Sequence, residues 1–262
     1  MAVLGIITCE ILELEFARIL RDDTDVRRIT ILQDPHSAHL IKQLQTQQDP
    51  RLHCIPHPHA FISEPDASLE VLVRVLAMGL HRNHRVLKNA LAKSAQSLSP
   101  SIDALLLGYG LCGGALEDVR SLLDIDLPVF QPMDSHQPMD DCVALCLGGR
   151  ERYYSEQCKT AGTYFLTPGW SRHWRRMLDE DAGELAQPGL KRLLSAYERV
   201  LLVETPVLGN DELRRRGNEF GQLTGLRMET QTGTLSSLTK AWDAAKDALR
   251  EQTMSHTAGG SG

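Results

Sequence analysis

The sequence predicts an α/β protein with a mostly parallel sheet of several strands, helices on both faces, and a Rossmann-like architecture. Two observations predict this class. Short apolar runs rich in β-branched residues alternate along the chain with segments of helical periodicity, which is the pattern of repeated βαβ units. Several of these runs are apolar at every position, as in strands buried on both faces. A chain of 262 residues is long enough for one large α/β domain.

The first half of the chain predicts four strands and three helices. We expect strands at residues 1–8, 28–32, 51–55 and 104–107. We expect helices after Cys9, with Leu12, Phe16, Ile19 and Leu20 on one face, at residues 38–47, and at residues 66–96. Asp66 is the expected N-cap of this last and longest helix, and Leu69, Leu72, Val73 and Leu76 form its apolar stripe. Two prolines predict irregular chain at residues 55–60.

The second half continues the alternation of helices and strands. We expect strands at residues 127–130, 162–166, 200–203 and 226–229. We expect helices at residues 116–123, from Cys142 to a stop at Gly148, from an N-cap at Ser171, and at residues 190–197, 210–224 and 234–250. The sequence predicts one domain over residues 1–254, with two similar halves meeting near residue 160 as an open alternative. Residues 255–262 are predicted to be a disordered tail.

Composition and charge narrow the class of protein. Hydrophobic residues make up 42% and charged residues 24%, as in ordinary soluble domains. The net charge of -6 and the absence of a long basic run do not favour nucleic-acid binding. No apolar stretch reaches the roughly 20 residues that span a bilayer, and the start of the chain lacks the features of a signal peptide. We therefore expect a cytoplasmic protein with reduced cysteines and no membrane partner.

The segment DALLLGYGLCGGA, residues 103–115, has two interpretations. Its glycines satisfy the dinucleotide pattern G-x-G-x-x-G, and the cofactor-binding candidates are Gly108, Gly110, Gly113 and Gly114. Glu117 and Asp118, at the start of the expected next helix, oppose an anionic ligand, and the dinucleotide pattern normally belongs to the first βα unit. Alternatively, the glycines expose backbone N–H groups beside Cys112, which stabilises a thiolate or a sulfur-rich cluster.

Three cysteines occupy similar positions in the predicted fold. Cys9 ends the first strand, Cys112 follows the glycine-rich turn, and Cys142 begins a helix. Because the carboxyl ends of parallel strands face one crevice, we expect the three cysteines to converge there. Three thiolate ligands would leave one position open on zinc or on a [4Fe–4S] cluster, and the glycine-rich backbone favours the cluster slightly. The remaining cysteines, which are interpreted as structural or incidental, are Cys54, Cys146 and Cys158.

Other polar residues near these positions are secondary candidates. Tyr109 and Tyr153 are candidate acids or supporting groups, and Glu10 is a candidate for orienting a ligand. Among ten histidines, His57, His59 and His136 are candidate ligands with solvated loop residues as the alternative, whereas His81 and His84 are interpreted as helix surface. The expected ligand of such a crevice is a small-molecule substrate.

The motifs together resemble those of a known family. They are ITCEIL with Cys9, GYGLCGG with Cys112, DDCVALCLGGRERYY with Cys142 and Tyr153, GTYFLTPGW, LLVETPVLGNDELRRRGNEF, and LRMETQTGTLSSLTKAW. By their order and spacing the chain resembles family 1638 of the domains of unknown function over nearly its full length. That family often has a histidine directly before the third cysteine, where this chain has Asp141. The resemblance implies an association with corrinoid-dependent methyl-transfer systems that act on methylated amines or betaines.

Three functional hypotheses remain open at this stage. The first is a metal-centre or iron–sulfur protein, either an enzyme or an accessory factor of methyl or one-carbon metabolism, built on the three cysteines. The second is a non-catalytic partner of a corrinoid or methyltransferase protein, which docks through the same crevice or through the region of Trp170. The third is a nucleotide-binding α/β enzyme that uses the GYGLCGG loop.

Overall fold

A computed structural model describes residues 2–64, 68–182 and 194–259 of the chain. Its larger sheet is entirely parallel. The strands in spatial order are β3 (Leu52–Ile55), β2 (Arg28–Leu32), β4 (Glu70–Leu76), β1 (Val3–Cys9), β5 (Ala104–Gly108) and β6 (Val129–Phe130). Helices cover both faces of this sheet, so the predicted α/β class with a Rossmann-like architecture is confirmed.

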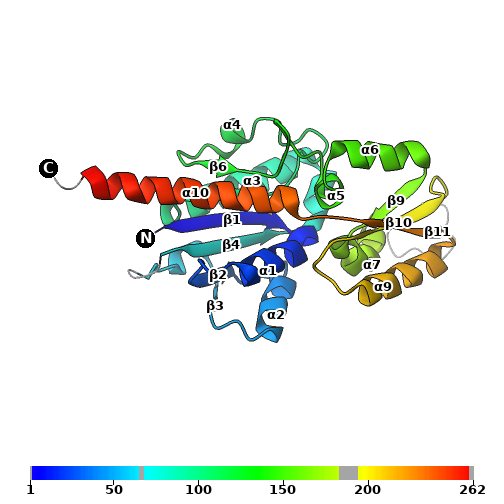
Figure 1. Cartoon of the computed structure of the whole chain (residues 1–262), viewed down its shortest axis with the longest axis horizontal. Coiled ribbons are helices and arrows are strands. Elements are labelled where there is room, and N and C mark those ends of the chain that lie inside the picture. Colours follow the sequence, from blue (N-terminus) through cyan, green and yellow to red (C-terminus); the bar gives the residue numbers. More distant parts are fainter. Residues whose placement is uncertain (1, 65–67, 183–193, 260–262) are drawn as a thin grey trace.

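The alternation of side chains along each strand explains why both faces of this sheet are covered. In β1, Leu4 and Ile6 point to one face, whereas Val3 and Ile7 point to the other. The first face packs against α1 (Glu13–Asp22), α2 (Ala38–Thr46) and α10 (Ser236–Gly259). The second face packs against α3 (His84–Leu98) and α4 (Val119–Leu123). Figure 1 shows α10 running along the larger sheet toward the end where the N-terminus lies.

A second, smaller sheet begins just beyond residue 160. It is also parallel, in the order β11 (Arg227–Thr232), β10 (Arg199–Glu204) and β9 (Thr163–Leu166). The helices around it are α6 (Arg150–Lys159), α7 (Pro168–Ala182) and α9 (Asn210–Thr224). Phe165, Leu201 and Val203 belong to the same buried cluster as Leu4 and Ile6 of the larger sheet. The two sheets therefore share a core.

The largest difference from the sequence prediction lies in residues 66–96. The first part of the expected helix is the central strand β4, and the prediction was wrong there. The apolar spacing of EVLVRVL fits a helix, but the segment is rich in valine and buried on both faces, which favours a strand of a parallel sheet. The helix α3 begins only at His84, where the Asn83 side chain accepts hydrogen bonds from the backbone N–H groups of Arg85 and Val86. The expected cap Asp66 lies outside the described residues.

Smaller differences concern the ends of elements. The helix α4 begins at Val119 rather than at residue 116. The helix α7 begins at Pro168 rather than after Ser171, because proline suits the first helical position and the Thr167 hydroxyl accepts from the Trp170 N–H. A short hairpin of β7 (Met133–Asp134) and β8 (Gln137–Pro138) was not predicted. The helix α10 continues to Gly259, into the predicted tail, and residues 190–193 of another expected helix lie outside the described residues.

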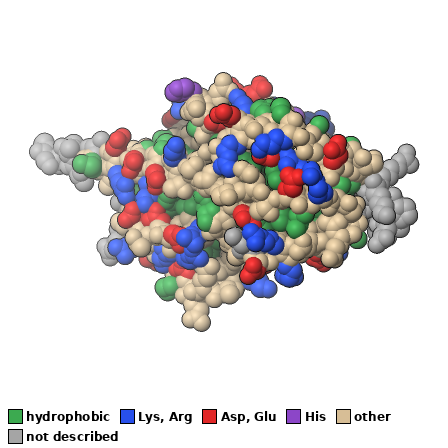
Figure 2. Space-filling model, turned by 45° about the vertical axis from the view of Figure 1, so that its right-hand side comes forward, with side chains coloured by type: hydrophobic (Ala, Val, Ile, Leu, Met, Phe, Trp, Pro, Cys, Tyr) green, Lys and Arg blue, Asp and Glu red, His purple; other side chains and the backbone are tan. Residues whose placement is uncertain are grey.

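The surface carries charges of both signs. Figure 2 shows acidic and basic side chains intermingled over the visible face. No helix in the described ranges has the length and apolarity needed to cross a bilayer.

Candidate functional site

A cavity of about 310 Å³ lies at the carboxyl ends of the central strands of the larger sheet. Its walls come from the segments that follow β1, β4 and β5, from the start of α5 (Cys142–Leu147), and from the first turn of α7. All three cysteines predicted from the sequence, Cys9, Cys112 and Cys142, line it. The edge of a parallel sheet where strands end is the usual location of a binding site in this fold.

Strand register brings two of the cysteines to this edge. Cys9 pairs with Leu76 of β4, and Thr8 pairs with Gly108 of β5. Cys9 therefore lies level with the end of β4, and Cys112 follows the end of the neighbouring strand β5 by four residues.

The loop that carries Cys112 is held in an unusual backbone conformation. Cys112, Gly113 and Gly114 have consecutive positive φ angles of 47°, 71° and 84°. A left-handed conformation at a residue other than glycine is uncommon and costs roughly 1–2 kcal/mol. Such strain persists only where surrounding contacts enforce it, and it is concentrated at functional sites.

The Cys112 loop is docked directly on the segment that precedes Cys142. The Leu111 N–H donates to the Met139 carbonyl at 2.7 Å, and the Cys112 N–H donates to the Asp140 carbonyl at 2.9 Å. Gly110 makes this contact possible, since a Cβ there would lie 2.6 Å from the Met139 oxygen. Backbone contact between the two loops therefore fixes the second and third cysteines relative to each other.

Cys142 is the first residue of α5, and Asp141 is its N-cap. The Asp141 Oδ1 atom accepts from the Ala144 N–H at 2.7 Å. Gly148 ends this short helix in a left-handed conformation, as the sequence predicts. Asp141 itself lines the cavity.

The smaller sheet closes the cavity through the start of α7. Gly169 packs so tightly that a Cβ would lie 1.8 Å from the Ile11 oxygen, and the next residue, Trp170, lines the cavity. Two buried carboxylates hold α7 in this position. Glu13 Oε1 lies 3.0 Å from His173 Nε2, and Glu10 Oε1 accepts from Arg176 at 2.8 Å.

Burial raises the pKa of all three thiols. Burial raises the pKa of Cys9 to about 12, with a smaller increase from the charge of Cys112. Burial also raises the pKa of Cys112 to about 12, and Asp141 adds to the increase. The pKa of Cys142 is raised well above its ordinary value by burial, then by Asp141 and by the other two cysteines. The thiols are therefore protonated at neutral pH unless a cation compensates their charge.

Two hydrogen-bond donors in the cavity wall have no partner. The Tyr109 hydroxyl and the Trp170 indole N–H are buried, and neither makes a hydrogen bond of normal geometry. Each donor lies beside a thiol. A weak interaction with Tyr109 lowers the pKa of Cys9, and a weak interaction with Trp170 lowers the pKa of Cys142. In both cases the increase caused by burial is larger. Buried unpaired donors are rare in folded proteins, so these two are available to a ligand.

The other predicted site residues do not all lie in the cavity. Gly108, Gly110 and Gly113 line it, but Gly114 faces Glu117 instead. Tyr153 stacks on Phe165 in the shared core with ring centroids 5.0 Å apart. Glu10 does not line the cavity, but its carboxylate connects two parts of the wall, because it accepts hydrogen bonds from the Met78 N–H and from Arg176 of α7.

The remaining candidate histidines and cysteines are also outside this cavity. His57 and His59 are exposed and contact each other in the loop after β3. His136 is exposed in the β7–β8 turn. Cys54 and Cys158 are exposed, whereas Cys146 is buried 3.8 Å from Glu15, and all six cysteines are free.

Sequence reasoning missed several residues of the cavity wall, chiefly His81 and His84. Both line the cavity beside Met78, in and after the short 3₁₀ turn of residues 78–82 that follows β4. Once β4 is assigned as a strand that ends at Leu76, these histidines are expected near the carboxyl end of the sheet, where binding sites usually lie. The misassigned helix over residues 66–96 hid that signal.

The geometry of the glycine loop does not favour a dinucleotide site. In that interpretation the second glycine lets pyrophosphate approach the backbone, but the space beside Gly110 is filled by the backbone of Met139 and Asp141. The next helix, α4, begins only at Val119, so no helix N-terminus follows the loop directly.

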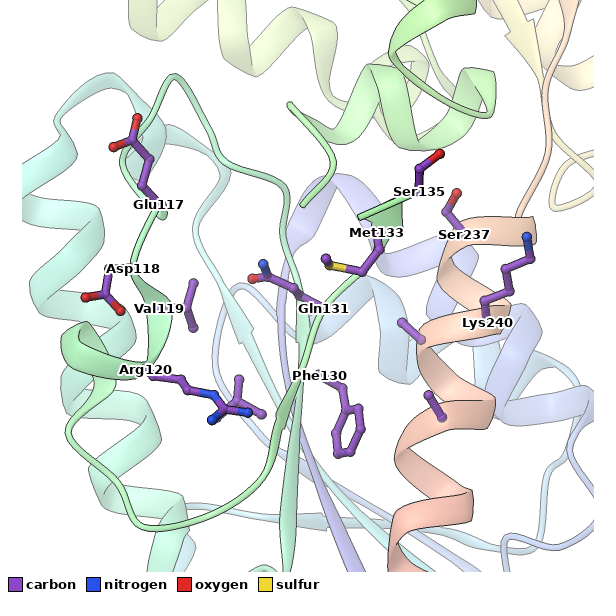
Figure 3. A pocket seen from close by; sticks show the side chains of 13 residues that line it. Glu117, Asp118, Val119, Arg120, Phe130, Gln131, Met133, Ser135, Ser237 and Lys240 are labelled. Carbon is purple, nitrogen blue, oxygen red and sulfur yellow. The ribbon is translucent and has the colours of Figure 1, made fainter. Parts of the chain in front are cut away.

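A larger cavity of about 560 Å³ lies at the edge strand β6, between α4 and α10 (Figure 3). Apolar groups such as Phe130 and Met133 and polar groups such as Arg120, Gln131 and Lys240 line it. It contains none of the cysteines, histidines or tyrosines considered above. We therefore regard the smaller cavity, which unites three thiols, as the candidate site.

No ready coordination group is present in the described ranges. There, no three or more histidine, cysteine, aspartate or glutamate side chains are already arranged to hold a metal ion. The three thiols share a cavity without forming such a group.

Fold and site together define the class: an α/β protein with a Rossmann-like sheet and a cysteine-lined cavity at the strand ends. The chain belongs to the protein family of unknown function DUF1638, whose model matches residues 75–242. This range includes Cys112 and Cys142 but not Cys9.

Comparisons with other proteins add little. No curated protein matches the chain. Two solved structures of N-acetyl-L-ornithine transcarbamylase variants complexed with PALAO are similar at 10% and 11% identity, with TM-scores of 0.19 and 0.17. The alignments cover 85% and 93% of this chain and 65% and 77% of those chains, so this chain spans less than two thirds of the first one.

Proposed function

We propose that this protein binds a metal centre through Cys9, Cys112 and Cys142 and uses it on a small substrate bound in the same cavity. The observation that carries the proposal is that three thiols from three separate segments line one cavity, where, beyond the effect of burial, the charge of Cys112 raises the pKa of both Cys9 and Cys142. Incidental buried cysteines gain nothing from such mutual proximity. A cation would make it favourable, because a coordinated thiol is deprotonated outright.

Among metal centres, the surroundings favour a [4Fe–4S] cluster over zinc. Gly113 and Gly114 place no side chain beside Cys112, which suits a bulky cluster better than a single ion. The unpaired donors of Tyr109 and Trp170 are beside Cys9 and Cys142, where each can donate either to a thiolate or to a ligand of the centre. Bound by three cysteines, either centre would supply an open coordination position for substrate.

Within this proposal, the chain's own residues have distinct tasks. The three cysteines would hold the centre, and the unpaired Tyr109 hydroxyl beside Cys9 is available to donate a hydrogen bond to a ligand there. Glu10 is a positioning residue, because it ties the turn that carries Met78 to α7 through Arg176. Trp170 and the apolar side chains of Ile11 and Val143 limit the access of water.

The resemblance of the family motifs suggests a cellular role. We propose that the protein is an enzyme or an accessory factor of corrinoid-dependent methyl transfer in one-carbon metabolism, working in the cytoplasm with a corrinoid or methyltransferase protein. Thiolate-bound metal centres suit that chemistry.

The test is metal and acid-labile sulfide content, together with an absorption spectrum, on protein purified without oxygen. We expect iron, sulfide and a broad visible absorbance, all lost in Cys9→Ser, Cys112→Ser and Cys142→Ser. Cys54→Ser and Cys158→Ser are matched controls, because both cysteines are exposed and outside the cavity, and they should retain the centre. If zinc is found without sulfide, the centre is a mononuclear zinc site and not a cluster. Absence of metal even after reconstitution would contradict the proposal.

A further inference from the structure

We propose that the cavity recognises its substrate through an oxyanion, a carboxylate or a phosphate, bound by His81 and His84. The inference deepens the proposed function, since it concerns the substrate of the same cavity. Both histidines line the wall that follows β4. A volume of about 310 Å³ suits a small ligand with one such group.

The hydrogen-bonding groups of the cavity are unbalanced toward donors. The Tyr109 hydroxyl and the Trp170 N–H lack partners, and tryptophan can only donate. Among the described residues of the wall, Asp141 is the one carboxylate, and its Oδ1 atom is engaged in capping α5. Sulfur is a weak acceptor, so the thiols alone do not satisfy these donors well. A ligand that contributes oxygen acceptors would correct the imbalance.

His81 is held in a defined orientation. Its Nδ1 atom lies 2.5 Å from the Met78 carbonyl oxygen, which can only accept, so Nδ1 carries a hydrogen. The Met78 N–H in turn donates to the buried Glu10 carboxylate at 2.9 Å. The ring also packs edge-on to Trp170, with centroids 6.2 Å apart. With Nδ1 fixed, Nε2 is the atom left for a ligand, and an oxyanion selects the imidazolium form, in which Nε2 donates.

His84 adds a second donor at the start of α3, a helix of 15 residues. Its Nε2 atom would lie 3.2 Å from a Cβ on Gly113, so the imidazole lies over the Cys112 turn. The two imidazoles and the unpaired donors of Tyr109 and Trp170 therefore favour the same kind of ligand group.

The experiment titrates the full chain, purified without oxygen, with sodium phosphate or sodium acetate at constant ionic strength. Acetamide is the neutral control. Tryptophan fluorescence reports binding, and Trp170→Phe identifies the signal of the residue next to His81. We expect saturable binding of at least one anion and none of acetamide. Affinity should fall roughly tenfold in His81→Gln and in His84→Gln, as for the loss of one charge-assisted hydrogen bond.

His57→Gln is the matched control, because His57 is an exposed loop histidine outside the cavity, and it should bind like the wild type. A preference for phosphate or for acetate assigns the oxyanion. No saturable binding of either anion, or equal binding by both cavity variants and the wild type, would overturn the inference. Metal content is measured on the same samples. Metal without anion binding refutes only this inference, whereas anion binding without metal refutes only the proposed centre.

Discussion

Replacement of Gly110 by alanine tests the contact that joins the Cys112 and Cys142 loops. The new Cβ would lie 2.6 Å from the Met139 oxygen and 2.8 Å from the Asp141 backbone, so the loops must separate or remain strained. Separation would weaken two backbone hydrogen bonds of about 1 kcal/mol each, and retained overpacking costs about 1–3 kcal/mol. By either route we expect the free energy of unfolding to fall by about 2 kcal/mol.

Urea denaturation followed by circular dichroism measures this change, and the iron content of the same variant shows whether the second and third cysteines are still held together. Gly209→Ala is the matched control. Gly209 has a φ of -61°, which alanine adopts readily, and no atom lies within 4 Å of its added Cβ. Because Gly209 is also the N-cap of α9, where alanine is less favourable than glycine, the control should lose no more than about 1 kcal/mol. If both variants unfold like the wild type, the tight docking of the two loops is incorrect.

Two further predictions concern buried ionisable side chains. Burial raises the pKa of Glu15 to about 8 from 4.5, so the folded state retains a proton and loses stability as pH rises between these values. Urea denaturation at pH 5 and pH 8 should show a smaller loss for Glu15→Gln than for the wild type; equal losses would contradict this. Arg199, 3% exposed, binds the buried Glu156, so Arg199→Leu should cost about 3–5 kcal/mol by the same method. The exposed control Arg227→Leu should cost under about 1 kcal/mol, and similar costs for both would refute the estimate.

The sequence predicts the fold class and most elements because local signals decide them. The capped helix from Cys142 to Gly148 has an N-cap aspartate and a C-terminal glycine, and both act as expected. The fully apolar run at residues 200–203 is the central strand of the smaller sheet. Where a strand is buried on both faces, however, nearly every position is apolar, and helical and strand periods fit equally well. That ambiguity produced the error at β4.

The error at β4 also shows that predicting which residues border a cavity depends on assigning the surrounding strands correctly. The prediction that Cys9 and Cys112 lie at one edge of the sheet succeeds because their strands were assigned correctly, and strand ends are where sites usually lie in parallel sheets. His84 is an exposed helix residue, as expected, but a helix assigned across β4 hid that it and the half-buried His81 also border this edge. Their role depends on the end of β4 at Leu76 and on the turn that Glu10 holds.

The closing wall of the cavity could not be predicted from local sequence at all. Glu10 and Glu13 look like ordinary helix-surface acids, yet both are buried because α7 of the smaller sheet packs over them. Their partners, Arg176 and His173, lie about 160 residues further along the chain. Two buried carboxylates need such partners, since unpaired charge in the interior is strongly unfavourable. The pairs that satisfy the carboxylates also press Gly169 against Ile11, and so bring Trp170 to the cysteines. The acids of α1 and of the turn before it thus hold α7 in the position that closes the cavity.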